Sequence, residues 1–171
     1  TPRHGKPVEI QALWIRALQV GVRLAAQFGE RAYAADCRRD RTRALTSFRT
    51  RFWYQRGQYL YDTIDGPEGD DPSIRPNQVY AISLCDDLLK KEQAIRVLQL
   101  VKEQLLTPVG LRTLSPQDNR YRPHYEGGPR ERDSAYHQGT VWPFLLGAFV
   151  TAWLNTFGRT SKIKREARSF L

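Results

Sequence analysis

The segment 131–144 concentrates side chains that could recognise or hydrolyse a sugar. Its sequence, ERDSAYHQGTVWPF, places these candidates directly ahead of a strongly apolar stretch: Glu131, Asp133, Tyr136, His137, Gln138 and Trp142. Carboxylates and amides hydrogen-bond sugar hydroxyls, and aromatic rings pack against the apolar face of a pyranose. Burying such groups beside a core without a purpose would cost free energy. We therefore predict a site here, although Asp133 and His137 could also pair to cap a helix.

Two further segments carry polar groups of the same kind. Glu9 lies in GKPVEIQALW (5–14), in the first turn of a predicted helix, where it could simply interact with the helix dipole. Arg75, Asn77 and Gln78 follow a Gly- and Asp-rich loop. The sequence leaves open whether Arg75 contacts a ligand or pairs with an aspartate of 70–71.

Two aspartates in YLYDTID (59–65) are less conspicuous. Asp62 and Asp65 flank a short extended piece, and we interpret both as turn-capping residues. Glycoside hydrolysis needs two carboxyl groups across the scissile bond, one protonated and one ionised. The four segments together contain enough carboxylates for that chemistry.

Other chemistries find little support in the sequence. There is no G-x-S-x-G nucleophile elbow and no phosphate-binding Gly-rich loop. The histidines, at 4, 124 and 137, lack metal-ligand spacing, and Cys37 and Cys85 cannot build a disulfide framework or a four-ligand metal site. We expect no metal and no cofactor.

The elements that must position these residues are predicted to be helices. Apolar spacing predicts helices over about 10–28 and 31–52, with Trp14 in the core, then a short extended piece near 59–64 and a surface loop at 66–73. Further helices are expected over 78–84, from a cap at Asp86 to before Pro108, from about 141 to 157, and over 162–170. Residues 107–136 are expected to be irregular. The pattern favours an all-α fold of helical hairpins.

The composition indicates how many domains the chain can form and in which cellular compartment it works. It has 171 residues, of which 40% are hydrophobic, which suits one ordinary domain and contains no apolar run long enough to span a membrane. The cysteine usage and the absence of a signal peptide favour the cytoplasm. Because there is no methionine, we expect the chain to be a fragment, residues 1–171 of a single larger domain.

The net charge of +9 is concentrated in arginines of the second predicted helix. Such a helix could follow nucleic-acid phosphates, but no nucleic-acid-binding motif accompanies it. We favour a solvated helix face and expect neither a nucleic acid nor a membrane as partner.

Four blocks in this order resemble the C-terminal glucosidase domain of bacterial and archaeal glycogen debranching enzymes. They are TPRHGKPVEIQALW (1–14), IRPNQVYAISL (74–84), TPVGLRTLSPQDNRY (107–121) and RDSAYHQGTVWPFLLGAF (132–149). The resemblance implies an (α/α)6 toroid with its active site where the connecting loops gather. The chain would be about half of that toroid, completed by an N-terminal part of the same protein or by a homodimer.

The implied activity is amylo-α-1,6-glucosidase: hydrolysis of the glucose left at a branch point of glycogen or limit dextrin, without a cofactor. The residues that match the shared blocks, and are expected to line the sugar site, are Glu9, Arg75, Asn77, Gln78, His137 and Gln138. From the site analysis, Tyr136 and Trp142 are expected beside them.

Two departures from the family concern the catalytic carboxyl groups. The family's general acid lies in a Gly-Arg-Asp segment, which this chain lacks, so we expect the fragment alone to be inactive. Eukaryotic members carry a base glutamate two residues after the Gly of the His-Gln-Gly block, where this chain has Val141. The base role is assigned to Asp133, with Glu131 and then Glu9 as alternatives. A non-catalytic carbohydrate-binding or scaffold module, and more weakly a nucleic-acid-binding helical domain, remain competing hypotheses.

Overall fold

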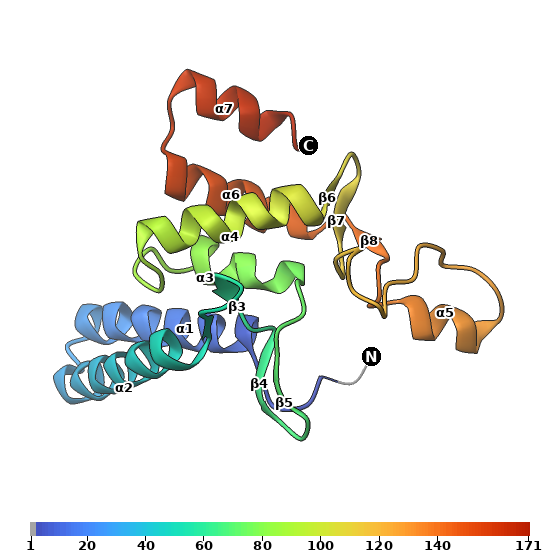
Figure 1. Cartoon of the computed structure of the whole chain (residues 1–171). Helices are drawn as coiled ribbons and strands as arrows, with labels where there is room; N and C mark the ends of the chain where they lie inside the picture. The colour runs from blue at the N-terminus through green and yellow to red at the C-terminus, as the bar shows by residue number, and fades with distance from the viewer. Residues whose placement is uncertain (1–2) are drawn as a thin grey trace.

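The computed structural model describes residues 3–171, which are mainly helical (Figure 1). The helices are α1 (Val8–Gln27), α2 (Arg31–Arg51), η1 (Pro76–Val79, a 3-10 helix), α3 (Tyr80–Ser83), α4 (Lys91–Gln104), α5 (Pro129–Ala135), α6 (Leu145–Phe157) and α7 (Ser161–Arg168). The all-α prediction is confirmed, whereas the (α/α)6 toroid stays a prediction. Among the described residues, no helix is both long and apolar enough to cross a bilayer.

Short antiparallel strands join the connections between helices. One sheet has the order β1 (Lys6–Pro7), β4 (Thr63–Gly66), β5 (Gly69–Asp71), and another the order β6 (Leu106–Thr107), β7 (Gly110–Arg112), β8 (Val141–Trp142). A hairpin links β2 (Trp53–Tyr54) with β3 (Tyr59–Leu60). The β4–β5 hairpin occupies most of the segment expected to be a surface loop. These pairings bring connections that are distant in sequence next to one another.

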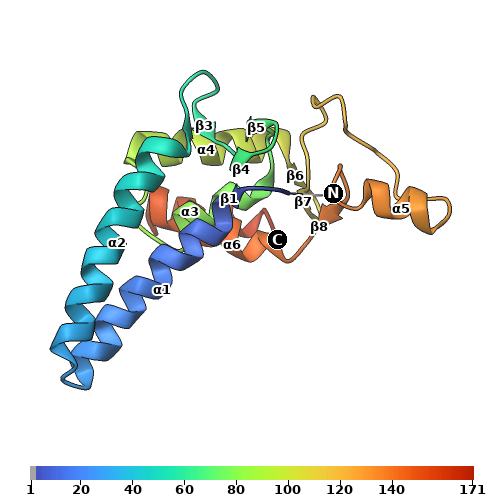
Figure 2. The ribbon, with the colours of Figure 1, turned by 90° about the horizontal axis from the view of Figure 1, so that it is seen from below.

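Helices α1 and α2 form an antiparallel hairpin whose tip projects from the body of the molecule (Figure 2). Gly29, with φ +76°, ends the first helix in a conformation that favours glycine. The base of α1 is anchored by Val8, Ala12 and Ile15, which are at most 1% exposed. The expectation that Trp14 is in the core is wrong, because its side chain is 54% exposed. The helix has apolar residues on two faces, and in this chain it is the face of Val8, Ala12 and Ile15 that packs inward.

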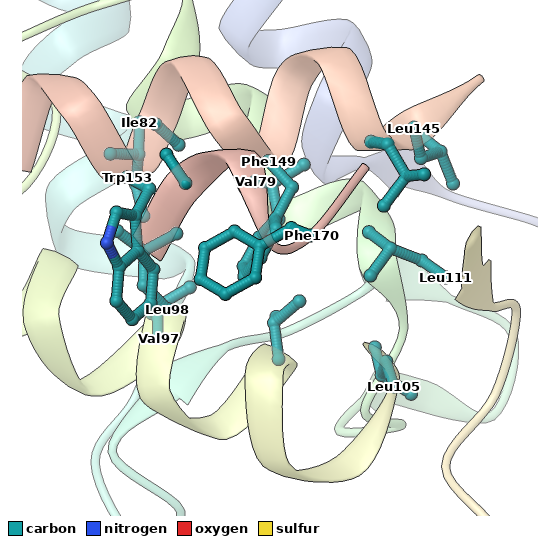
Figure 3. Packing of buried hydrophobic residues seen from close by; sticks show 14 of the residues in the cluster. Val79, Ile82, Val97, Leu98, Leu105, Leu111, Leu145, Phe149, Trp153 and Phe170 are labelled. Atoms are coloured by element: carbon teal, nitrogen blue, oxygen red, sulfur yellow. The ribbon is translucent and has the colours of Figure 1, made fainter. Parts of the chain in front are cut away.

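Two apolar clusters hold the body together. Figure 3 shows the larger one, where Leu98 of α4, Phe149 and Trp153 of α6, and Phe170 after α7 pack together. The smaller cluster gathers the base of the α1–α2 hairpin around residues such as Ile15. Helix η1 contributes Val79 to the larger cluster, and α3, which follows it directly, contributes Ile82 to the larger and Ala81 to the smaller cluster. The RPNQ block that opens η1 is therefore fixed between the two clusters.

Several element boundaries differ from the sequence prediction. Helix α6 begins at Leu145 rather than at about 141, because Val141 and Trp142 pair with β7 as strand β8. Helix α4 begins at Lys91 rather than after Asp86, and the Lys90 N–H donates to the Gln93 side chain at 3.0 Å as an alternative cap. The segment expected to be irregular contains α5, which begins at Pro129, where the missing N–H costs no helical hydrogen bond.

Candidate functional site

Asp62 is a buried carboxylate at the junction of β3 and β4. Leu60, Asp62 and Ile64 alternate onto one face and are 1%, 2% and 3% exposed. The Asp62 carboxylate accepts hydrogen bonds from Nε and Nη2 of Arg3 at 2.7 and 2.9 Å. It is therefore part of the interior, and our interpretation of it as a turn-capping residue is wrong.

Arg3 joins Asp62 to Glu9. Its Nη1 and Nη2 donate to the two carboxylate oxygens of Glu9 at 2.5 and 2.9 Å. The Glu9 side chain keeps 16% of its surface exposed, whereas that of Asp62 keeps 1%. Glu9, in the first turn of α1, is thus held by a bidentate arginine in addition to the helix dipole.

Arg75 extends this chain of charges towards β8. Its Nε lies 3.7 Å from the Asp62 carboxylate, and its Nη2 donates to Oε1 of Gln138 at 2.9 Å. Its Nη1 donates to the backbone carbonyls of Thr113 and His137 at 3.1 and 2.6 Å. Arg75 therefore forms an ion pair with Asp62, and its guanidinium hydrogen bonds are made to other groups of this chain. We call the connected set Arg3, Glu9, Asp62, Arg75 and Gln138 the Arg3–Arg75 network.

Burial and charge act in opposite directions on the pKa values of this network. Burial raises the pKa of Asp62, while Arg3 and Arg75 act to lower it. Burial lowers the pKa of Arg75, opposed by the charge of Asp62. Burial also acts to lower the pKa of Arg3, but its hydrogen bonds to Glu9 and Asp62 outweigh this and raise it. For Asp62 and Arg75 burial therefore outweighs the ion pairs, whereas for Arg3 the pairs outweigh burial.

Gln78 and Asn77 have different environments although they are adjacent. Gln78 is 2% exposed, donates to the Arg75 carbonyl at 3.0 Å and accepts from the Leu60 N–H at 3.4 Å, so it positions the residues around the network. Asn77 is half-buried, and its side chain makes no hydrogen bond within residues 3–171. Of the two amides, Asn77 is the one available to a ligand.

The His-Gln-Gly block (137–139) packs closely against the loop before α5 and is hydrogen-bonded to it. The Arg122 N–H donates to the Gln138 carbonyl at 2.6 Å, and a Cβ added at Gly139 would lie 2.5 Å from the Arg122 carbonyl oxygen. The Gly139 N–H donates to Thr113 Oγ1 at 2.9 Å. Only glycine allows this close approach at φ +140°.

His137 sits between the network and α5. Its carbonyl binds Arg75, and its Nδ1 is buried with no hydrogen-bond partner among the described residues. Burial lowers its pKa, as do the charges of Arg75 and Arg3, while Asp133 acts to raise it. The imidazole is thereby held in its neutral form at neutral pH.

A cavity of about 490 Å³ lies next to the network. Arg3 and the β4–β5 hairpin line it, together with Arg120. Arg120 is itself held by Asp118 at 2.8 Å and lies 3.8 Å from Asp71. The cavity is large enough for a sugar unit, and charged residues such as Asp70 and Asp71 alternate with glycines and prolines in its wall.

The remaining predicted site residues lie on and after α5. Asp133 and Glu131 are exposed, and neither side chain makes a hydrogen bond or ion pair within the part of the chain that the structure describes. Tyr136 is 43% exposed, and its ring contacts those of His137 and Trp142 at 4.8 and 5.1 Å. The structure thus joins Arg75 to Gln138 directly and to Glu9 through Asp62 and Arg3, and it leaves both predicted base carboxylates outside the network.

Sequence reasoning missed Asp62, Arg3 and Arg120. The period-two alternation with Leu60 and Ile64 was a usable signal for Asp62, since the same face of an extended segment carries all three. Arg3 and Arg120 each have one partner close in sequence, Glu9 and Asp118, but the contacts that bring them to the site are made with the distant Asp62 and Asp71.

A helical chain that gathers carboxylates, arginines and amides beside a polar cavity fits a carbohydrate-processing domain. The family model for amylo-alpha-1,6-glucosidase matches residues 1–171, and the chain belongs to this family, as the resemblance predicted. It is similar to the glycogen debranching enzyme of Saccharomyces cerevisiae, with 36% identity over 113 residues. That match covers 63% of this chain and 7% of the relative, so the chain spans only a small part of that protein's length.

Proposed function

We propose that this chain is part of a glycoside hydrolase that releases α-1,6-linked glucose from the branch points of glycogen or limit dextrin. The observation that carries the proposal is the convergence of four separate segments in the Arg3–Arg75 network, beside a cavity of about 490 Å³. Membership of the amylo-alpha-1,6-glucosidase family supports the same chemistry. The reaction takes no metal or organic cofactor and belongs to glycogen breakdown in the cytoplasm.

The network supplies sugar-binding groups that are fixed before the substrate arrives. Glu9 keeps an exposed edge while Arg3 fixes the plane of its carboxylate, so it can accept hydrogen bonds from sugar hydroxyls. Asn77 and Gln138 add amides, while the buried Arg75 and Gln78 hold the surrounding backbone. The rings of Tyr136, His137 and Trp142 form an aromatic border to this site.

Asp133 is the proposed base of an inverting mechanism. A base must reach a water molecule and keep a lone pair free to take its proton. Both oxygens of Glu9 accept from Arg3, whereas the exposed Asp133 carboxylate has no such partner within residues 3–171. Glu131, on the same helix, is the next candidate. In an inverting hydrolase the acid and the base are about 6.5–9.5 Å apart, which leaves room for the attacking water.

The general acid and the rest of the active site come from outside this chain. We assign the general acid to another part of the same protein. A second copy in a homodimer would complete the toroid but would lack the same Gly-Arg-Asp segment. The isolated 171 residues should therefore bind branched glucan weakly and release no measurable glucose.

Glucose release from a branched limit dextrin by the whole protein that carries this chain tests the assignment. We expect Asp133→Asn to lower the rate by about 10²–10⁴-fold, with dextrin binding retained. The control Asp86→Asn replaces another exposed aspartate, which lies in the connection between α3 and α4 and outside the network, and should leave the rate unchanged. An unchanged rate in Asp133→Asn would reject Asp133 as the base, and the Glu131→Gln and Glu9→Gln variants would then identify its replacement.

A non-catalytic glucan-binding module is the second candidate, favoured by the full engagement of Glu9 and Asp62 in ion pairs. If the whole wild-type protein binds dextrin but releases no glucose, this candidate is correct. The nucleic-acid alternative has less support, because Arg39, Arg41 and Arg51 of α2 are each paired with aspartates.

A further inference from the structure

Four aromatic rings contact one another in a row at the α5 end of the molecule. The ring centroids of Tyr125 and Tyr136 are 6.0 Å apart, those of Tyr136 and Trp142 are 5.1 Å apart, and those of Trp142 and Phe144 are 5.6 Å apart. We call these four residues the aromatic row. They come from the loop before α5, the end of α5, strand β8 and the start of α6, so the fold assembles them from separate segments.

The aromatic row is exposed to solvent. Tyr125, Tyr136 and Phe144 are 50%, 43% and 63% exposed, and Trp142 is half-buried. A contiguous apolar surface of this kind usually marks a binding site. The exposed rings of Phe28 and Tyr33, at the tip of the α1–α2 hairpin, differ because neither contacts another aromatic ring in the described part of the chain.

A cavity lies beside the loop that carries Tyr125, although the four residues of the aromatic row do not themselves line it. It has a volume of about 340 Å³, and its lining includes Arg122, His124, Glu126 and Glu131. Both signs of charge are present, so the cavity has hydrogen-bond donors and acceptors without a strong field of one sign. This combination suits a neutral ligand rich in hydroxyl groups better than a charged polymer.

The aromatic row is also continuous with the candidate site. The His137 ring contacts those of Tyr136 and Trp142 at 4.8 and 5.0 Å, and the His137 carbonyl accepts a hydrogen bond from Arg75 at 2.6 Å. A ligand on the row would therefore extend directly from the network.

We propose that the aromatic row binds an extended strand of α-1,4-linked glucan, while the cavity beside Arg3 takes the single branch glucose. The inference rests on the proposed function and deepens it, because a branch point has both a glucose stub and a main strand. Successive rings would stack against the apolar faces of successive glucose units. Tyr125 and Phe144, which no sequence argument singled out, become strand-binding residues.

Binding of maltohexaose, a linear strand without a branch, tests the inference. Affinity is measured by calorimetry and by gel electrophoresis in the presence of glycogen, using the whole protein that carries this chain. We expect Tyr125→Ala combined with Phe144→Ala to weaken binding about tenfold or more. The matched control, Phe28→Ala combined with Tyr33→Ala, removes one phenylalanine and one tyrosine ring that are also exposed, at the hairpin tip, and should bind as the wild type does.

Two outcomes would overturn the inference. One is unchanged maltohexaose affinity in the Tyr125/Phe144 variant while its circular dichroism and melting temperature match the wild type. The other is a change in self-association, by light scattering, without a change in glucan affinity, which would make the aromatic row a protein interface. If instead the variant unfolds, the Tyr125→Leu and Phe144→Leu pair keeps apolar bulk without flat rings and must show the same loss of affinity.

The failure of the proposed function gives a different result. A wild-type protein that releases no glucose from limit dextrin, but loses maltohexaose binding when the aromatic row is removed, contradicts hydrolysis and leaves the strand site intact. If the wild-type protein releases glucose and the Tyr125/Phe144 variant binds maltohexaose as tightly as the wild type does, only the strand-binding inference is contradicted, and the proposed hydrolysis stands.

Discussion

Asp62 and Asp133 are both aspartates in polar segments, yet the fold gives them opposite environments. Asp62 is 2% exposed and is held between Arg3 and Arg75, with its distances to both fixed by surrounding backbone. Asp133 is exposed on a helix of seven residues, and its carboxylate makes no hydrogen bond within residues 3–171. A carboxylate of the first kind can hold other groups in place, whereas one of the second kind is free to accept a proton. The residue proposed to position other groups, Asp62, and the residue proposed to act as the base, Asp133, thus lie in different regions of the molecule.

Removing each carboxylate tests this division most strongly. Asp62→Ala leaves the buried Arg75 and the partly buried Arg3 without their shared partner, so the free energy of unfolding should fall by about 3–5 kcal/mol. Asp133→Ala, at an exposed and unpaired position, should change it by less than about 0.5 kcal/mol. Urea denaturation of the two variants measures the difference. Similar losses in both would show that the network does not stabilise the fold.

A smaller effect is expected at the contact between the two regions, where Gly139 meets the loop before α5. An alanine Cβ would lie 2.5 Å from the Arg122 carbonyl oxygen and 2.7 Å from the Tyr121 ring. Gly139→Ala should therefore cost roughly 1–3 kcal/mol of unfolding free energy. The control Gly147→Ala, within α6 and with no atom within 4 Å of its added Cβ, should stabilise by roughly 0.5–1 kcal/mol. Equal changes in the free energy of unfolding for Gly139→Ala and Gly147→Ala would mean that the loop containing Arg122 can shift without cost.

The smallest expected effect is a pH dependence at His137. Its pKa in the folded protein is lowered from the usual 6.5, first by burial and then by Arg75 and Arg3. In the window just below pH 6.5 the unfolded chain therefore binds a proton that the folded protein does not. The contribution of His137 to stability is present above this window and is lost as the pH falls through it to the lowered pKa.

The His137→Asn variant isolates this contribution. The difference in unfolding free energy between wild type and variant, measured from pH 7.5 to pH 5, should decrease as the pH falls. A difference that is constant, or that grows with falling pH, would show that the imidazole is not held neutral.

Local pattern predicted much of the helical framework. The expected helices at 10–28 and 31–52 correspond to α1 and α2, because apolar spacing and Gly29 are local signals. Which face of α1 is buried could not be predicted, since apolar residues lie on two faces and the choice depends on packing partners. Trp14 is an example, because it lies on the apolar face of α1 that remains exposed.

The candidate site was predictable only in part. Glu9, Arg75 and Gln138 were found by residue type, and the structure connects them. Asp62 was assigned to a turn because its burial depends on Arg3 and Arg75, 59 and 13 positions away in sequence. The short strands β1 and β8 were missed for the same physical reason: two residues become a strand only through a distant partner.

A crystal structure of the whole protein that carries this chain, with isomaltose, the α-1,6-linked glucose disaccharide, tests the central claim most directly. The account predicts sugar hydroxyls within hydrogen-bond distance of Glu9 or Arg3, in the cavity beside the β4–β5 hairpin, with the His137–Trp142 border next to the second ring. Sugar bound only elsewhere, for example in the hollow between α4, α6 and α7, would contradict it.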